Sequence, residues 1–560
     1  MPDHDYVPLM FQAQVSGRSQ IQKLEDLKKK SQELGLNKDT LHQQAYDWAK
    51  QWQEACDKRN VPTFEAHVQT RQYKFTWRMV TNSGQDAGVI RPVIGERGWA
   101  YFPGSSMKGA FLRACKQICP LDEVLRFCGG NGKDGELHPG VLRFHGGYPK
   151  DAEWLDDSLV DVVHPQEDWQ LDGQKNNGAF IQISLDQPTF VFGISSREVL
   201  IQAEWATVWQ IWDQAIGRGI GSRVSAGYGQ TKTHGESNLL TVRLRGEGIA
   251  SQRIDKTGEF RPNVFKAALR GHTRRLLSGI ADETTAERLT KELWGGFLGR
   301  DGAISGKVGI AFSAPDLELR NEHRTSVYDT GEATLNLLVM QDVSEQQRKN
   351  LKVLLTQIIK FSMLLGGFGK SWRRTDHRLF FPKYLDDSRK CMIGCHWELL
   401  EKSLGFCVPV KQLSDVTRFL DGMQGKIAGF PMLRDLSPKA PNATMKETWR
   451  KGNVEVWGRI AEDENDSVAV RWFHGAYQGQ HSIYRSDLTG KMGQIGRVWH
   501  RMYPRYLPAL AEKMPPRETE QFIELLTIFP NRSGNPDEVA KTQEFLKFLQ
   551  DSHDGFEKLW

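Results

Sequence analysis

Residues 102–113 read Phe-Pro-Gly-Ser-Ser-Met-Lys-Gly-Ala-Phe-Leu-Arg, and residues 260–270 read Phe-Arg-Pro-Asn-Val-Phe-Lys-Ala-Ala-Leu-Arg. In each stretch a Phe stands six residues before the Lys, turn-forming residues lie between them, and an Arg follows the Lys by about one helical turn. Pro, Gly, Ser and Asn before an apolar run are typical of a helix start. The two stretches therefore predict two related helices.

Two further elements accompany each stretch in the same order. An Asp in a polar loop precedes it, Asp86 in the first case and Asp255 in the second. A glycine-rich basic loop follows at a similar distance, in residues 217–229 and 366–374. Three kinds of element repeated in one order predict two copies of a single α+β unit.

Length and composition limit the class of protein. The chain has 560 residues, of which 39% are hydrophobic and 26% charged, so we expect packed cores in roughly three or four domain-sized units. No apolar run approaches the roughly 18 residues that span a bilayer, the first residues lack the pattern of a secretory signal, and the seven cysteines are few. We expect a reduced, cytoplasmic protein with no membrane partner.

Basic residues are placed unevenly along the chain. Nine Lys or Arg accompany three acids in residues 243–278, and residues 488–511 contain no acid while Lys and Arg alternate with Trp and Tyr. Basic side chains interleaved with aromatic ones suit a polyanion whose bases can stack. A solvated face above ordinary core aromatics is the alternative interpretation.

Candidate anion ligands gather at the start of the first predicted helix. We expect a hydroxyl of Ser105 or Ser106 to cap its first free N–H groups. A helix N-terminus with these hydroxyls and Lys108 is suited to bind an anion, and Arg113 follows about one turn later. A core helix with an ordinary cap is the alternative.

The second predicted helix carries a row of cations. Lys266, Arg270 and Arg274 recur every four residues, so they share one side of the helix. Apolar residues occupy another side. This pattern predicts an exposed basic ridge that phosphate groups would neutralise.

The two glycine-rich loops allow a close approach of backbone N–H groups to phosphate. Their candidate phosphate ligands are Arg218, Arg223, Lys370, Arg373 and Arg374. Gly-Lys-Ser at 369–371 does not complete a nucleotide-binding P-loop, because that motif needs glycine where this chain has Leu364. Tight turns with incidental cations are the alternative.

Cysteine and histidine spacing does not favour a metal centre. Two sets have ligand types suited to zinc, and they are Cys115, Cys119 and Cys128 with His138 or His145, and Cys391 and Cys395 with His396. Neither set has the paired spacing of common zinc sites. Structural zinc is therefore not expected.

The motifs in residues 102–113, 225–229 (Ser-Ala-Gly-Tyr-Gly) and 86–91 (Asp-Ala-Gly-Val-Ile-Arg) resemble the RAMP superfamily of CRISPR proteins. The resemblance covers about residues 65–235 and continues less closely over 240–385. The tandem arrangement is similar to fused double backbone subunits of type III-D systems. It implies an α+β fold of two tandem modified ferredoxin-like (RRM-type) domains with insertions.

The expected domain organisation follows from the repeat and the resemblance. A first backbone domain spans residues 1–240, with a helical hairpin inserted at 18–60. A second spans 241–400. Residues 401–560 form a C-terminal extension that either completes the second domain or stands separately.

The resemblance also implies a function. Its partners are guide RNA (crRNA), target RNA and other effector subunits in a hetero-oligomer. Target RNA is cleaved with a divalent metal, Mg²⁺ or Mn²⁺, and Asp86 matches the catalytic loop residue. Asp255 matches less well, because it lies closer to its Lys than Asp86 does. The chain lacks Gly-Gly-Asp-Asp, so the cyclase of the large type III subunit is not expected.

Two other functions remain open. A scaffold that holds guide RNA without cutting would need the basic residues but not Asp86. A guide-processing endoribonuclease of the same superfamily would depend on a His or Lys acid–base pair.

Overall fold

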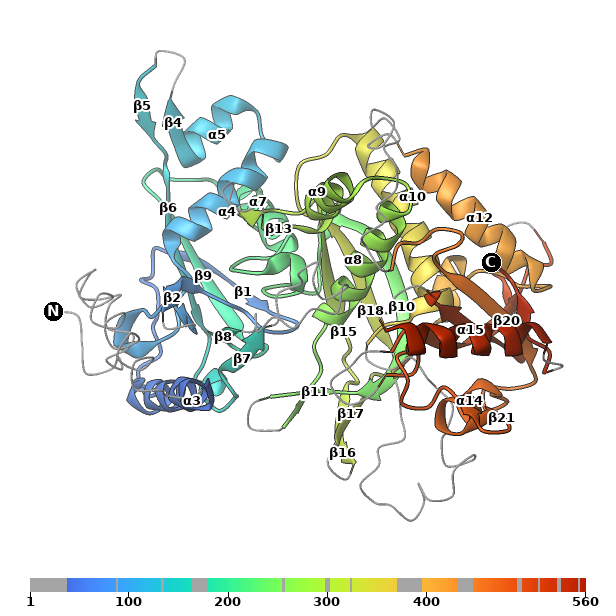
Figure 1. Cartoon of the computed structure of the whole chain (residues 1–560). Coiled ribbons are helices and arrows are strands. Elements are labelled where there is room, and N and C mark those ends of the chain that lie inside the picture. Colours follow the sequence, from blue (N-terminus) through green and yellow to red (C-terminus); the bar gives the residue numbers. More distant parts are fainter. Residues whose placement is uncertain are drawn as a thin grey trace. The chain divides into compact units, whose positions relative to one another are not determined.

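The computed structural model has a mixed α+β fold, as predicted (Figure 1). Its contacts divide into two compact units, the first mainly Met1–Pro165 and Gly178–Asn238, the second mainly Leu239–Val308 and Ala314–Trp560. The structure describes residues 38–86, 89–131, 135–163, 180–253, 257–297, 303–322, 325–369, 395–430, 447–490, 496–511, 514–530, 535–551 and 554–560. Among these residues, no helix combines the length and apolar character needed to cross a membrane.

The first unit contains four main helices and nine strands in its described part. The helices are α3 (Lys38–Ala55), α4 (Gly104–Ile118), α5 (Leu121–Cys128) and α7 (Gln202–Gly217). The strands are β1 (Gln69–Lys74), β2 (Asn82–Asp86), β3 (Val89–Pro92), β4 (Gly129–Asn131), β5 (Leu137–Pro139), β6 (Leu142–Pro149), β7 (Val160–Val163), β8 (Phe180–Ile183) and β9 (Thr189–Ser196).

An antiparallel sheet in the order β1-β9-β6 forms the centre of the first unit. Alternate residues of β9 are large and apolar, and Phe190, Phe192 and Ile194 have no exposed surface. Helices cover these side chains, since Phe192 lies 5.2 Å from Trp212 of α7 between ring centroids. The apolar side of the sheet and the apolar side of the helix thus pack together in one core. A second sheet has the order β2-β3-β8-β7.

The second unit is larger. Its main helices are α8 (Asn263–Ser278), α9 (Glu283–Trp294), α10 (Glu345–Phe361), α12 (Ser414–Ala428), α14 (Ala469–His474) and α15 (Pro536–Asp551). Its strands are β10 (Asn238–Ile249), β11 (Ser251–Gln252), β12 (Gly258–Glu259), β13 (Gly296–Phe297), β14 (Ala303–Ile304), β15 (Val308–Ser313), β16 (Glu318–Glu322), β17 (Thr325–Asp329), β18 (Ala333–Val339), β19 (His396–Leu399), β20 (Glu455–Ala461), β21 (Ala476–Gln478), β22 (His481–Ser482), β23 (Val498–Leu507), β24 (Arg517–Ile528) and β25 (Glu557–Lys558).

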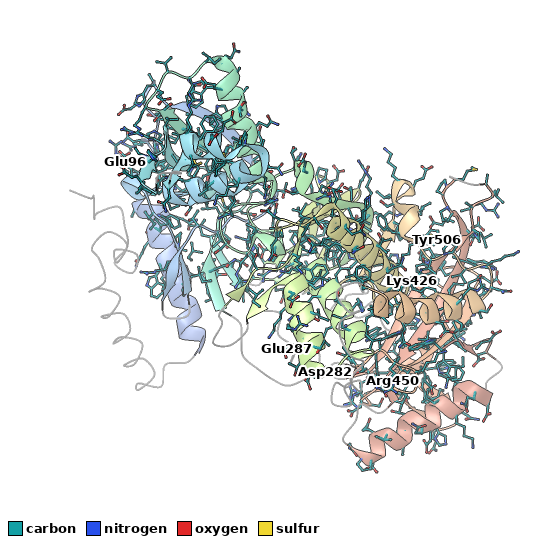
Figure 2. The ribbon with its side chains drawn as sticks, turned by 90° about the horizontal axis from the view of Figure 1, so that it is seen from above. Glu96, Asp282, Glu287, Lys426, Arg450 and Tyr506 are labelled. Atoms are coloured by element: carbon teal, nitrogen blue, oxygen red, sulfur yellow. The ribbon has the colours of Figure 1, made fainter. Side chains whose placement is uncertain are left out.

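Two sheets organise these elements. One has the order β15-β18-β10-β17-β16, with β19 also paired to β10. The other has the order β23-β24-β20-β25 and is built from strands of the C-terminal part of the chain. Some helices begin at a residue whose side chain caps the first free N–H groups. Asp282, for example, accepts a hydrogen bond of 3.0 Å from Thr285 N at the start of α9 (Figure 2).

The order of elements is the same in both units up to the long helix before each glycine-rich loop. A strand is followed by a hairpin, two helices, a short hairpin, a strand, another strand pair, a strand and a long helix. In the first unit these are β1, β2–β3, α4–α5, β4–β5, β6, β7–β8, β9 and α7. In the second they are β10, β11–β12, α8–α9, β13–β14, β15, β16–β17, β18 and α10. The sheet orders β1-β9-β6 and β10-β18-β15 also correspond.

The expected helical hairpin at 18–60 is described only in its second arm. That arm is α3, and its Trp52 is fully buried, with Nε1 donating a hydrogen bond of 2.6 Å to Gly98 O. Residues 1–37, which contain the first arm, lie outside the described residues.

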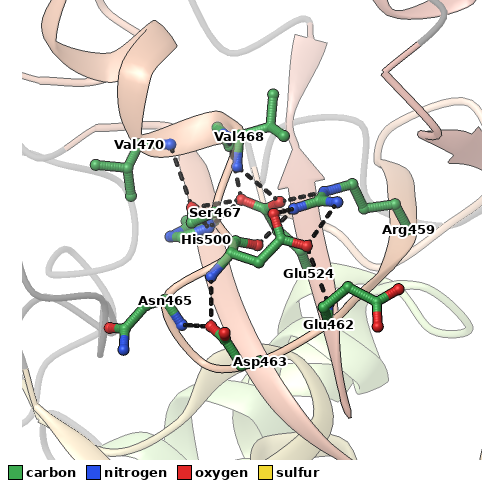
Figure 3. A network of polar contacts seen from close by, with 11 residues as sticks. Arg459, Glu462, Asp463, Asn465, Ser467, Val468, Val470, His500 and Glu524 are labelled. Carbon is green, nitrogen blue, oxygen red and sulfur yellow. Dashed lines mark hydrogen bonds and ion pairs between the residues drawn. The ribbon is translucent and has the colours of Figure 1, made fainter. Parts of the chain in front are cut away.

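A buried carboxylate organises the C-terminal sheet. Glu524 has no exposed surface and lies 3.0 Å from His500 Nε2 (Figure 3). It accepts hydrogen bonds from Ser467 Oγ at 2.6 Å and from Arg459 Nε at 2.7 Å. Ala469 N donates another at 3.0 Å. Glu524 thus joins two strands to the first turn of α14.

Candidate nucleic-acid interface

Helix α4 begins one residue earlier than the predicted serine cap. Its N-cap is Pro103, no side chain caps it, and its first residue is Gly104. The predicted cap by Ser105 or Ser106 is therefore wrong, and both serines are exposed. A Cβ at Gly104 would lie 2.1 Å from Phe144 O, so the close contact with β6 requires glycine there.

The exposed side of α4 carries the predicted anion ligands. Lys108 and Arg113 are exposed, whereas Met107 and Phe111 are fully buried. Gly104 N donates a hydrogen bond of 3.3 Å to Tyr101 Oη, and Met107 N donates one of 2.9 Å to Pro103 O. The N–H groups of Ser105 and Ser106, at the positive end of the helix dipole, therefore have no acceptor among the described residues. This is the arrangement in which helices bind anions.

The first glycine-rich loop is attached to the segment that follows β1. Gly229 N donates a hydrogen bond of 2.8 Å to Arg78 O, and Ser222 N donates one of 3.0 Å to Val80 O. Gly221 has a φ of +86°, and a Cβ there would lie 2.4 Å from Val80 O. Only glycine fits this backbone path.

The helix and the loop enclose a cavity of about 350 Å³. Ser106 and Arg113 of α4 line it together with loop residues more than a hundred positions later in the chain. Its wall is formed by Thr81, Val93, Phe102, Pro103, Ser106, Gly109, Ala110, Arg113, Gly219, Ile220, Gly221, Ser222 and Val224. Ser105, Lys108, Arg218 and Arg223 do not line it, so the structure brings together only part of the predicted set.

Gly221 presents an unused backbone donor to this cavity. Gly221 is exposed, and its N–H forms no hydrogen bond with any residue that the structure describes. The neighbouring Ile220 N is occupied, because it donates to Gly229 O at 3.0 Å. The loop therefore has one backbone N–H without an acceptor among the described residues. It lies between Ile220 and Ser222, whose N–H groups both donate hydrogen bonds.

Arg223 is placed differently from the prediction. It adopts a left-handed conformation with φ of +60° and is half-buried. Burial lowers the pKa of Arg223, while the nearby Tyr228 and Asp161 raise it. The guanidinium of Arg223 therefore interacts electrostatically with the buried carboxylate of Asp161.

Sequence analysis did not identify Asp161 as part of this region. Asp161 lies in β7 with no exposed surface, and its Oδ2 accepts hydrogen bonds from Tyr228 Oη at 2.7 Å and from Gln182 Nε2 at 2.6 Å. Tyr228 belongs to the glycine-rich loop. An acid between two valines in a short strand is the signal that could have identified it, since acids are rarely buried without partners.

Asp86, which we predicted to lie in a polar loop, is instead the last residue of β2. Its backbone pairs with Val89 across a tight hairpin. Thr81 and Val93, which flank this hairpin, both line the cavity. Five residues of strand place the backbone of Asp86 about 15 Å beyond Thr81. Asp255 lies outside the described residues.

The predicted basic ridge of the second copy is buried rather than exposed. Lys266, Arg270 and Arg274 are 8%, 4% and 2% exposed. Arg274 Nη1 donates a hydrogen bond of 3.0 Å to Glu283 O. The reason is tertiary, since α9 packs against this helix, and Trp294 Nε1 of α9 donates a hydrogen bond of 3.0 Å to Thr273 Oγ1 next to Arg274.

The second copy differs from the first at this position. When Lys108 is aligned with Lys266, Val264 stands at the position of Ser106, and the corresponding Arg270 comes one residue earlier than Arg113 and is buried. The helix and the described part of the second loop are in contact, with Phe265 and Phe368 ring centroids 4.9 Å apart. The predicted ligands Lys370, Arg373 and Arg374 lie outside the described residues.

The basic and aromatic stretch at 488–511 is largely the core strand β23. Arg501, Tyr503 and Tyr506 are each 1% exposed, and Trp499 is 4% exposed. These rings do not present a stacking surface for bases. The alternative interpretation, ordinary core aromatics, is the correct one for this strand.

The described residues contain no group of three or more His, Cys, Asp or Glu side chains arranged to hold a metal ion. Burial raises the pKa of Cys119 to about 12, and Cys115 and Cys128 are buried. These thiols are packed parts of α4 and α5. They do not form a metal centre in the described structure.

No protein-family model and no curated protein matches the chain. Among solved structures, a chain of the type III-B Cmr-beta complex bound to cognate target RNA is 18% identical over 28% of this chain and 55% of its own length, with a TM-score of 0.22. This chain thus spans about half the length of that match.

Two other solved structures contain smaller chains, and the match covers almost the whole of each. A chain of a type IV-B CRISPR complex is 18% identical over 29% of this chain and 88% of its own, with a TM-score of 0.21. Cmr6 from Pyrococcus furiosus is 16% identical over 29% of this chain and 96% of its own, with a TM-score of 0.20. Matches this partial do not establish a family for the chain.

Proposed function

We propose that this chain is a RAMP-type backbone subunit of a type III CRISPR effector complex, and that its first unit holds guide RNA. The proposal combines the sequence resemblance over residues 65–235 with the cavity between α4 and the first glycine-rich loop. We further propose that both units are modified ferredoxin-like domains. Their shared element order supports this, as does the order β15-β18-β10-β19 in the second sheet.

The observation that carries the RNA-binding proposal is the wall of the cavity. Ser106 and Arg113 meet the backbone of residues 219–222 there, although the helix and loop are far apart in sequence. A guanidinium, a hydroxyl and the backbone N–H of Gly221 are donors without a competing carboxylate in the wall. Such a set binds a phosphate of a nucleic-acid backbone.

The size of the cavity suits more than an isolated ion. Its volume of about 350 Å³ lies in the range of ligand pockets. Val93, Phe102 and Ala110 supply apolar wall opposite the donors. A phosphate with its attached sugar has this combination of charged and less polar surface.

We propose that Asp86 acts on a second strand, the target RNA. The hairpin that carries it starts at the cavity wall and extends about 15 Å from it. This reach would separate the phosphate held in the cavity from the one that is cut. The carboxylate would position the 2′-hydroxyl for in-line attack on the neighbouring phosphate. The resemblance implies Mg²⁺ or Mn²⁺, but no described cluster fits a metal, so we assign no metal ligands.

The RNA-binding proposal is tested with Arg113→Ala. The binding constant for a labelled single-stranded RNA is measured against salt concentration. Losing one phosphate contact should weaken binding about tenfold and reduce the salt slope by about one. Lys116→Ala is the matched control, because Lys116 is exposed on the same helix but does not line the cavity. Equal effects of both substitutions would refute a site at the cavity.

A further inference from the structure

Gln230 is a fully buried side chain directly behind the first glycine-rich loop. Its Nε2 donates hydrogen bonds to Val224 O at 2.9 Å and to Arg218 O at 3.3 Å. Both partners are carbonyl oxygens, so the nitrogen of the amide must face the loop. One side chain thus connects two points of the loop backbone.

The two bonded carbonyls flank the residues that line the cavity. Arg218 precedes Gly219–Ser222, and Val224 follows them. The amide of Gln230 therefore fixes both ends of the segment that contains Gly221, which lines the cavity and whose N–H has no acceptor among the described residues. A shift of either end would redirect this donor.

Gly219 lies directly against the same amide. Its φ is +84°, and a Cβ at this position would be 2.5 Å from Gln230 Nε2. The backbone and the amide are thus too close for any side chain between them. This contact limits the loop to one path above Gln230.

The contacts of the two amide atoms differ. Oε1 of Gln230 is buried and has no hydrogen-bond partner among the described residues, so it offsets part of what the amide contributes to folding. Nε2 makes both of the hydrogen bonds that hold the loop backbone.

We propose that Gln230 is a positioning residue that aims the backbone N–H of Gly221 into the anion cavity. The inference rests on the proposed function, since it concerns the same cavity. It adds a residue that touches no ligand. Its effect on RNA reaches the cavity through Arg218, Val224 and Gly219.

The test compares Gln230→Leu with Gln53→Leu. Gln53 is a matched control, because its Nε2 also donates to two backbone carbonyls of the same unit, Leu155 O and Asp157 O, away from the cavity wall. Binding of a labelled single-stranded RNA and thermal unfolding are measured for each. We expect Gln230→Leu to weaken RNA binding about tenfold, which corresponds to the loss of roughly one hydrogen bond to a phosphate. Its melting temperature should change no more than that of Gln53→Leu.

Hydrogen exchange gives a second readout. In Gln230→Leu the amides of Ile220 and Gly229 should exchange faster, because their hydrogen bonds depend on the loop path. Gln230→Met, an unbranched side chain of similar length, replaces the leucine variant if that variant does not fold.

Failure of this inference is distinct from failure of the proposed function. If the unaltered protein does not bind the RNA, the proposed function is wrong. If it binds, and Gln230→Leu binds as tightly as Gln53→Leu with unchanged exchange in residues 217–229, then Gln230 does not position the loop.

Discussion

The hydroxyl of Tyr228 donates a hydrogen bond of 2.7 Å to Oδ2 of Asp161, a carboxylate with no exposed surface. Tyr228 belongs to the glycine-rich loop, and Asp161 belongs to β7 in the second sheet of the first unit. That sheet also contains the β2–β3 hairpin with Asp86. The loop that lines the cavity and the hairpin of the proposed catalytic residue thus share one buried anchor.

Tyr228→Phe removes this hydrogen bond and leaves the ring in place. A bond to a buried charged acceptor contributes more than one between neutral groups, so the free energy of unfolding should fall by about 2 kcal/mol. Urea denaturation measures the change. Tyr484→Phe is the control, because Tyr484 is 47% exposed. An equal change in both variants would contradict the role of Asp161.

Asp86→Ala tests the proposed cleavage. We expect unchanged recovery of the complex and its guide RNA, with the rate of one target cut reduced by about 100-fold or more. The measurement is the pattern of fragments from an end-labelled complementary RNA. Asp122→Ala, which removes an exposed acid elsewhere in the first unit, should leave that pattern unchanged.

Other outcomes identify the alternatives. No cut by the unaltered protein in its complex, or an unchanged pattern in Asp86→Ala, favours the non-catalytic scaffold. Loss of a second cut in Asp255→Ala means that both copies are active. Cleavage of the guide precursor alone favours the processing endoribonuclease.

The burial of Arg270 changes the result that we expect for Arg270→Ala. An exposed ridge predicts weaker RNA binding and a lower salt slope. Because Arg270 is 4% exposed, we expect instead a loss of about 2 kcal/mol or more in the free energy of unfolding, with an unchanged slope. The salt dependence of RNA binding and the free energy of unfolding are both measured on one preparation. A lower slope with unchanged stability would mean that RNA reaches this helix.

Glu524 predicts the pH dependence of the second unit. Burial raises the pKa of Glu524, but His500, Arg459 and Ser467 outweigh it and lower the pKa below its ordinary value of 4.5. A lowered pKa in the folded state gives stability that is complete above pH 4.5 and is lost as the pH falls toward the folded pKa. The free energy of unfolding should therefore decrease below pH 4.5.

Glu524→Gln should remove this contribution. At pH 7 the variant should lose about 3 kcal/mol, because Arg459 is left without its buried charged partner. Below pH 4.5 its stability should depend less on pH than that of the unaltered protein. Glu520→Gln, an exposed position in the same strand, is the control. Parallel pH curves for both variants would contradict the assignment.

Sequence periodicity predicted the elements whose signals are local. The helices predicted from residues 102–113 and 260–270 correspond to α4 and α8. The motif residues Ser106 and Arg113 do lie with the glycine-rich loop, because the helix and the loop each carry short-range signals. Their function stays a prediction.

The errors have tertiary causes. Arg270 has the pattern of an amphipathic ridge, but α9 packs against that helix, and Arg274 of the same ridge donates a hydrogen bond to Glu283 O of α9. The N-cap of α4 is Pro103 and its first helical residue is Gly104, so neither serine stands at the cap position. Gln230 and Asp161 gave no motif, because their roles depend on distant carbonyls and on Tyr228.

Five of the six described cysteines are buried, and Cys119 is only partly accessible. A new thiol at Ser105, on the open face of α4, would consequently react with maleimide dyes faster than these native ones. A fluorophore could then be installed at the rim of the cavity while these six cysteines remain in place. Its emission would follow guide loading in real time.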